Sequence, residues 1–226
     1  MAARVKLSIV IPVLNEAAVI GGTLASLAPL RARGHEVIVA DGGSEDATRE
    51  LAAPLADRVV IAPRGRARQM NAGAAAAGGD ALLFLHADTR LPAGADDLIF
   101  LSLEKFQWGR FDVRIDGAHP MLRVVAFAMN LRSRLTGIAT GDQAIFVRHG
   151  MFRGFPEIAL MEDVAFSNVM KRRSPPACLR AKVTTSGRRW HRQGVLRTMF
   201  LMWRLRLAYF LGAAPDDLAR RYANKS

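Results

Sequence analysis

The chain has 226 residues, of which half are hydrophobic, and a formal net charge of +12. This length and composition predict one domain with a substantial core, and no stretch reaches the roughly 18 uncharged apolar residues that a membrane-spanning helix needs. Residues 171–226 contain 14 Lys and Arg and 2 Asp and Glu, and residues 1–170 contain 18 of each kind. The neutral body excludes a dedicated nucleic-acid binder, which needs a charged face on its folded domain.

The first ninety residues predict strands that alternate with helices. Strands are expected at residues 7–13, 36–40, 58–61 and 81–85, and the last of these is a continuous apolar run, typical of a strand buried on both faces. Helical spacing or composition is found between them, over residues 17–30, 48–55 and 65–78. The alternation favours an α/β fold with a mostly parallel central sheet flanked by helices.

The second half predicts a more varied order of elements. Helices are expected at residues 92–106, 119–135 and 165–171, and strands at 109–115, 144–147 and 181–185. A very apolar helix with spaced arginines is expected over residues 195–211, within the basic C-terminal tail.

Ionisable residues follow two of the buried strands directly. Asp41 ends the second strand, and the fourth strand runs into His86, Ala87 and Asp88. Ligands of open α/β sheets bind outside the carboxyl ends of the strands, where a carboxylate can hold a divalent cation against a phosphate. The alternative is that these residues only form turns and begin helices.

Neither the dinucleotide GxGxxG turn nor the Walker phosphate loop is present. The segments 9–16, 40–48, 66–73 and 83–89 together resemble family-2 glycosyltransferases of the GT-A (nucleotide-diphospho-sugar transferase) fold. Matches at Glu162-Asp163 and, more loosely, at Arg189-Trp190 extend the resemblance over most of the chain. The surroundings of 108–112 and 209–212 resemble a subgroup associated with radical-SAM enzymes and a proposed role in arsenosugar biosynthesis.

The resemblance implies two halves in a catalytic domain of residues 1–190: a nucleotide-binding half, about 1–90, and an acceptor half, about 91–190. Residues 191–226 form the basic tail. The implied nucleotide-sugar site, with a UDP-sugar favoured, consists of Pro12, Asn15, Glu16, Asp41, Arg66, Arg68, Asn71, His86, Ala87 and Asp88. In it Glu16 lies near the ribose, Asp41 accepts from the base, and the arginines face the diphosphate.

Asp88 is the expected ligand of Mn²⁺ or Mg²⁺, because hard cations prefer oxygen ligands and bridge diphosphate oxygens. The family pattern has an acidic residue two positions before this Asp, and this chain has His86 there. That departure puts the strength of metal binding in doubt. His191 is a further candidate ligand.

Asp163 is the expected general base, which takes the proton of the acceptor hydroxyl during a direct displacement with inversion. Gly141, Asp142, Gln143, Glu162, Arg189 and Trp190 are expected on the acceptor side. Arg189-Trp190 resembles the Gln-x-x-Arg-Trp element of processive relatives, but Ser186 replaces its Gln. Transfer of a single sugar to a hydroxyl acceptor is therefore expected. The alternative for Glu162-Asp163 is an acidic pair at a helix N-terminus.

The tail leaves alternatives open, because its apolar helix can lie on an anionic membrane or pack on the domain or on a second subunit of a homodimer. The single cysteine, Cys178, indicates a reducing compartment. We therefore expect a cytoplasmic protein, peripheral at the inner face of the membrane if the tail binds lipid. Two rival functions are a nucleotidyltransferase on a similar sheet and a non-catalytic module that binds a membrane surface or a protein.

Overall fold

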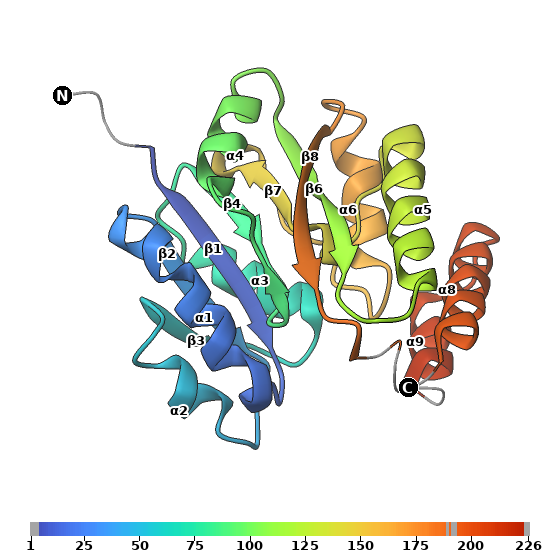
Figure 1. Ribbon diagram of the computed structural model, residues 1–226, viewed down its shortest axis with the longest axis horizontal. Helices are drawn as coiled ribbons and strands as arrows, with labels where there is room; N and C mark the ends of the chain where they lie inside the picture. Colours follow the sequence, from blue (N-terminus) through green and yellow to red (C-terminus); the bar gives the residue numbers. More distant parts are fainter. Residues whose placement is uncertain (1–4, 189, 191–193, 224–226) are drawn as a thin grey trace.

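A computed structural model describes residues 5–188, 190 and 194–223 of the chain. Its centre is an eight-stranded sheet with the order β3-β2-β1-β4-β7-β6-β8-β5 (Figure 1). The strands are β1 (Leu7–Val13), β2 (Glu36–Asp41), β3 (Arg58–Ile61), β4 (Ala81–Phe84), β5 (Thr89–Arg90), β6 (Trp108–Ile115), β7 (Ile145–Arg148) and β8 (Ala177–Thr185).

The first four strands are parallel, as the alternation of strands and helices predicts. They are connected by α1 (Ala17–Ala32), α2 (Thr48–Ala52) and α3 (Arg66–Ala75). The second half departs from a parallel sheet, because β7 is antiparallel to both β4 and β6, and β5 is antiparallel to β8. The sheet is therefore mixed, with its parallel part in the first ninety residues and a second parallel pair, β6 and β8.

The remaining helices are α4 (Ala95–Leu103), α5 (Met121–Thr136), α6 (Glu162–Met170), α8 (Val195–Phe210) and α9 (Pro215–Ala223), with short 3-10 turns at Gly141–Gln143 and His149–Met151. Alternate residues of β1 point to opposite faces of the sheet. Ile9 and Ile11 join a core with α1, α4 and α5, whereas Val10 joins a second core with α3 and α6. Helices α8 and α9 lie beside α5, on the side of the molecule away from β3 (Figure 1).

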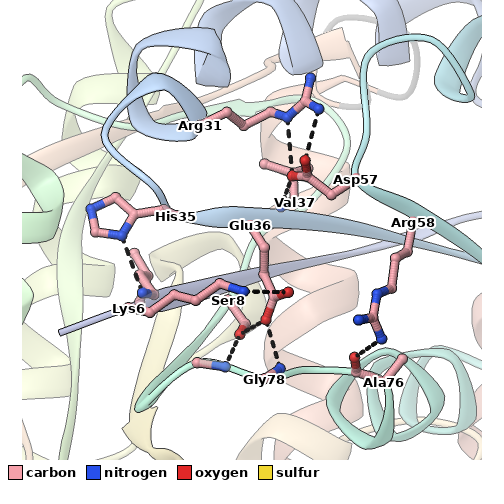
Figure 2. Close-up of polar contacts among 12 residues, drawn as sticks. Lys6, Ser8, Arg31, His35, Glu36, Val37, Asp57, Arg58, Ala76 and Gly78 are labelled. Carbon is pink, nitrogen blue, oxygen red and sulfur yellow. Dashed lines mark hydrogen bonds and ion pairs between the residues drawn. The ribbon is translucent and has the colours of Figure 1, made fainter. Parts of the chain in front are cut away.

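Polar side chains fix the amino ends of β1 and β2 (Figure 2). The buried Glu36 carboxylate accepts hydrogen bonds from Ser8, from Lys6 Nζ at 2.9 Å and from the Gly78 N–H at 2.6 Å. Burial alone would raise the pKa of Glu36, but these hydrogen bonds outweigh it and lower the pKa. Nearby, Arg31 pairs with Asp57 at 2.8 Å. These contacts stabilise the fold. They lie at the amino ends of the strands, opposite the carboxyl ends of β1, β2 and β4.

A charged network attaches α5 to β6. The Arg110 side chain is fully buried, donates to Asp112, and reaches the Asn130 carbonyl at 3.3 Å. The second oxygen of Asp112 accepts from Arg134 at 2.6 Å. The Asn130 side chain also accepts from the Val113 N–H at 2.8 Å. The packing of α5 on β6 therefore depends on one carboxylate that compensates a buried guanidinium.

We expect Asp112→Asn to destabilise the protein by about 3–5 kcal/mol, because removing one partner of a buried ion pair leaves the other uncompensated. The measurement is chemical denaturation, with the exposed Asp116 changed to Asn as the matched control. A loss no larger than that of the control would mean that Asn130 alone is enough to compensate Arg110.

Candidate active site

A small cavity lies at the carboxyl end of β4, between α3 and α6. It is lined by Arg66, Met70, Phe84, His86, Gly141, Ile145, Phe155, Glu162 and Asp163. Five of these residues come from the sequence-predicted site, and they belong to four separate segments of the chain. The cavity is therefore where segments expected to bind the donor meet segments expected to bind the acceptor.

The first turn of α6 supplies the two acidic residues of the cavity. Glu162 is buried and pairs with Arg66 at 3.3 Å. Burial raises the pKa of Glu162, Asp163 raises it further, and Arg66 only partly offsets this. Asp163 is half-buried and accepts from the Gly141 N–H at 3.0 Å and from its neighbour, the Val164 N–H, at 2.7 Å. Both oxygens of Asp163 are thus oriented by backbone donors.

Arg66 lies at the start of α3, where the positive end of the helix dipole adds to its charge. Burial would lower the pKa of the Arg66 guanidinium, but Glu162, Asp163 and Asp142 outweigh it and raise the pKa. The side chain is half exposed. It can therefore meet an anionic ligand while it is paired with Glu162.

His86 joins the two halves of the site. Its Nδ1 lies 3.2 Å from the Asp142 carboxylate, and its Nε2 is buried with no hydrogen-bond partner among the residues that the structure describes. A Cβ atom added to Gly141 would lie 2.4 Å from that Nε2. Only glycine therefore allows the 141–143 turn to approach the end of β4 so closely.

A second pair of acidic residues, Glu16 and Asp88, lies next to the pair formed by Glu162 and Asp163. Arg188 donates to both Glu16 and Asp88, each at 3.4 Å. Burial raises the pKa of Glu16, Arg188 lowers it, and Asp88 raises it again. The charge of His86 lowers the pKa of Glu16 and of Glu162, so the two acidic groups are neighbours. Sequence reasoning missed Arg188 as a site residue; the only signal was its position next to Arg189-Trp190.

The side chains here fit a divalent cation only together with a ligand. No three His, Cys, Asp or Glu side chains lie close enough to hold a metal by themselves in the described part of the chain. Mg²⁺ is commonly bound by one or two carboxylates plus the phosphates of a substrate. Asp88 and its neighbour Glu16 offer that kind of donor set.

Asp41 and Asn15 shape the loops beside this acidic group. The Asp41 carboxylate is fully buried and accepts from the Gly43 and Ser44 N–H groups, each at 3.0 Å. Asn15 adopts a positive φ of 54° and accepts from the Glu45 N–H at 2.9 Å. These bonds tie the loop after β1 to the loop after β2. Recognition of a base by Asp41 stays a prediction.

Several other predicted residues have structural contacts. Arg68 is exposed and pairs with Glu157 at 3.2 Å, and Asn71 bonds to the backbone of Phe155 at 2.7 and 2.9 Å. Gln143 is fully buried and forms a capping box with Thr140.

The rest of the predicted set is placed as follows. Pro12 is half-buried within β1, and buried Ala87 accepts from Thr23 through its carbonyl. Trp190 is half-buried and packs against the core of α1, α4 and α5. Arg189 and His191 lie outside the described residues, so their expected roles stay predictions.

Solved structures with a similar fold include glycosyltransferases. Residues 1–349 of S. aureus TarS, in complex with UDP-GlcNAc, superpose with a TM-score of 0.63 at 19% identity, over 80% of this chain and 58% of that chain. Glucosyl-3-phosphoglycerate synthase from Mycobacterium tuberculosis, in complex with Mn²⁺, UDP and glucosyl-3-phosphoglycerate, superposes with a TM-score of 0.57 at 20% identity, over 80% and 70%. At these identities the similarity shows the GT-A fold alone.

Curated relatives are similar in sequence as well. A PGL/p-HBAD biosynthesis glycosyltransferase of Mycobacterium tuberculosis (strain ATCC 25177 / H37Ra) is 32% identical over 170 residues, which is 64% of this chain and 60% of that protein. A protein of the same description from Mycobacterium bovis has the same identity and coverage. The chain thus spans about 60% of the length of these relatives. Residues 8–161 match the model of the family described as Glycosyl transferase family 2. Because this match covers more than half of the chain, and the fold agrees with it, the protein belongs to glycosyltransferase family 2.

Proposed function

We propose that this protein transfers a single sugar from a nucleoside-diphosphate sugar, UDP-linked by preference, to a hydroxyl acceptor, with inversion and with the help of Mn²⁺ or Mg²⁺. The observation that supports this most directly is the position of Asp163. Its carboxylate is oriented by two backbone N–H groups at the wall of a cavity that also contains Arg66 and His86.

The donor end of the site supplies positive charge for a diphosphate. Arg66 at the α3 N-terminus and Arg188 can each donate charge-assisted hydrogen bonds to phosphate oxygens. Asp88 and Glu16 would hold the cation, which neutralises charge that builds on the departing nucleoside diphosphate. The complexes of TarS with UDP-GlcNAc and of the mycobacterial synthase with Mn²⁺ and UDP support this choice of donor and ion.

At the acceptor end, Asp163 takes the proton of the acceptor hydroxyl. The freed oxygen attacks the anomeric carbon from the face opposite the diphosphate, which leaves with the electron pair of the broken bond. The Gly141 N–H keeps Asp163 in place, and base catalysis of this kind contributes roughly 10²–10⁴-fold. Because Glu162 pairs with Arg66, it orients the arginine and leaves the proton transfer to Asp163.

The narrower assignments stay predictions. Membership of the radical-SAM-associated subgroup, with a role in arsenosugar biosynthesis, rests on segments 108–112 and 209–212. The expected cytoplasmic location rests on the single cysteine.

The donor site can be tested by isothermal titration with UDP and GDP, with and without Mn²⁺. We expect UDP to bind and Mn²⁺ to strengthen binding. We expect Asp88→Asn to remove the gain from Mn²⁺, and Arg66→Gln to weaken UDP at least tenfold through loss of a charge-assisted bond. Failure to bind any nucleoside diphosphate would favour a non-catalytic module, and release of pyrophosphate during turnover would favour a nucleotidyltransferase.

The general base can be tested with Asp163→Asn. We expect the release of nucleoside diphosphate from a panel of nucleotide sugars to fall at least 10²-fold, because the amide cannot accept the proton. UDP affinity should change by less than twofold, since Asp163 does not contact the donor phosphates in this mechanism. Asp116→Asn is the control for a distant carboxylate. Unchanged turnover in Asp163→Asn would remove this residue from its proposed role.

The surface formed by α5 and α8 supports a proposal about location. Val124, Phe127, Leu131 and Leu135 on α5 are between 44% and 77% exposed. Five large apolar side chains on α8, and Leu211 directly after it, are between 58% and 79% exposed; the five are Leu196, Phe200, Trp203, Leu207 and Phe210. In the described part of the chain, no helix has the length and apolar character needed to cross a bilayer.

The charges around this surface favour an anionic bilayer as its partner. Neither α5 nor α8 contains an acidic residue, and Arg123, Arg134, Arg197 and Arg204 on these helices are exposed. Apolar side chains combined with a basic rim are typical of helices that lie in the membrane interface. We therefore propose that the α5–α8 surface rests on anionic lipid.

Co-sedimentation with vesicles tests this surface. We expect binding to vesicles that contain phosphatidylglycerol, little binding to pure phosphatidylcholine, and weakening by salt. Trp203→Asp should reduce binding at least fivefold, because it places a charge in the buried part of the interface. Leu101→Asp, at an exposed apolar position on α4, should not. A dimer that forms without lipid and depends on Trp203 would contradict the proposal and assign the surface to a second copy.

A further inference from the structure

A partly buried arginine on α5 has no compensating partner. The Nε and Nη2 atoms of Arg132 are buried and lack hydrogen-bond acceptors within the residues that the structure describes. Arg134, two positions along the same helix, pairs with Asp112. Because buried polar groups in native proteins are almost always hydrogen-bonded, an orphaned guanidinium needs an explanation.

The surroundings of Arg132 make its isolation more costly. Burial, then the nearby positive charge of Arg206 on α8, and also that of Arg110, lower the pKa of Arg132 to about 10. Arg110 is already compensated by Asp112. Neither Arg132 nor Arg206 has a carboxylate within ion-pair distance in the described ranges 5–188, 190 and 194–223. Within the described residues, the guanidinium groups of Arg132 and Arg206 therefore lie near each other without a carboxylate to compensate them.

The location of these two groups relates them to the proposed reaction. Of the described residues that shift the pKa of Arg132, only Asp163 favours the charged guanidinium. Asp163 also lines the cavity that contains Arg66 and His86. Arg66 belongs to α3, whereas Arg132 and Arg206 belong to α5 and α8, and Leu205 of α8 packs with Met161 and Val164, the residues that flank Glu162 and Asp163. An acceptor that presents its hydroxyl to Asp163 would thus extend toward Arg132.

We propose that Arg132, assisted by Arg206, binds an oxyanion carried by the acceptor, and so holds the acceptor hydroxyl against Asp163. The inference rests on the proposed glycosyl transfer and narrows the acceptor to an anionic molecule that carries a phosphate or a carboxylate. The planar guanidinium presents paired N–H donors in the geometry that such oxyanions accept. A neutral acceptor would leave the two like charges uncompensated.

The experiment uses inorganic phosphate and acetate as probes of the full chain saturated with UDP, so that the donor diphosphate site is filled. Isothermal titration should detect a saturable anion site. Arg132→Gln should weaken that site at least tenfold, and Arg206→Gln severalfold. Arg123→Gln, an exposed arginine of the same helix, is the matched control and should leave it unchanged. The probe that binds more tightly identifies the group that the acceptor carries.

Thermal unfolding separates binding from a structural role. Without a probe, Arg132→Gln should unfold at the same temperature as the parent or higher, because an uncompensated buried charge is removed. Phosphate should raise the Tm of the parent and of Arg123→Gln, but not that of Arg132→Gln. Arg132→Lys keeps the charge but not the planar fork, so it should lose affinity severalfold at unchanged Tm.

Equal anion affinity in Arg132→Gln and the parent, or complete displacement of phosphate by UDP, would overturn the inference. The acceptor inference and the proposed donor site can fail independently of each other. Normal UDP binding with no Arg132-dependent anion site defeats only the acceptor inference. Arg132-dependent anion binding without any UDP binding defeats the donor proposal and leaves the anion site standing.

Discussion

The close approach of Gly141 to the ring of His86 is the contact on which the whole site depends. It is possible only because position 141 has no side chain. Through it the end of β4, in the donor half, touches the turn at 141–143, and the backbone of that same turn donates to Asp163. One steric condition therefore fixes the distance between the residues proposed to face the diphosphate and the proposed base. A side chain at position 141 would push the two halves of the site apart without changing any ionisable group.

Charge is arranged around this contact before any ligand arrives. Arg66 neutralises part of the buried Glu162, and Arg188 bridges Glu16 and Asp88. Arg66 and Arg188, which pair with these carboxylates, are also the side chains that a diphosphate would attract. Exchange of a carboxylate partner for a phosphate changes few positions, so the cost of reorganisation at the moment of reaction is small. The raised pKa of Glu162 reflects a carboxylate that the fold buries in order to hold Arg66.

Local sequence was sufficient for the parallel half of the fold and insufficient for much of the site. Continuous apolar runs such as Leu82 to Leu85 can be satisfied only as buried strands, and their polar ends necessarily meet at one edge of a parallel sheet. By contrast, β5 has two residues and exists because Thr89 pairs with Thr185 of β8. Likewise, Arg188 is separated from Glu16 by 172 positions. Such pairings follow from tertiary packing, and the spacing of apolar residues along the sequence does not indicate them.

Some polar residues of the predicted site also have structural contacts that their type alone does not indicate. Asn71 and Gln143 have the side chains of ligand-binding residues, yet the first satisfies the backbone of Phe155 and the second caps a turn. Gly141 was expected on the acceptor side, but its steric role became evident only when the ring of His86 was in place. Arg132 and Arg206 lie in segments that were expected to be helices, the second with spaced arginines, and neither residue was expected in the site.

The two helices that contain Arg132 and Arg206 depart from the usual arrangement of a surface helix in two respects. A surface helix normally buries its apolar stripe and exposes its charges. Here α5 and α8 expose Phe127, Trp203 and their apolar neighbours, while Arg132 turns two nitrogen atoms inward. Both features cost free energy in the isolated chain, since water solvates the apolar face poorly and the interior solvates the charge poorly. In the two proposals each cost is relieved by a different partner, lipid outside and an oxyanion inside. An enzyme whose acceptor side is incomplete by itself has a structural reason to be most stable when it is docked and loaded.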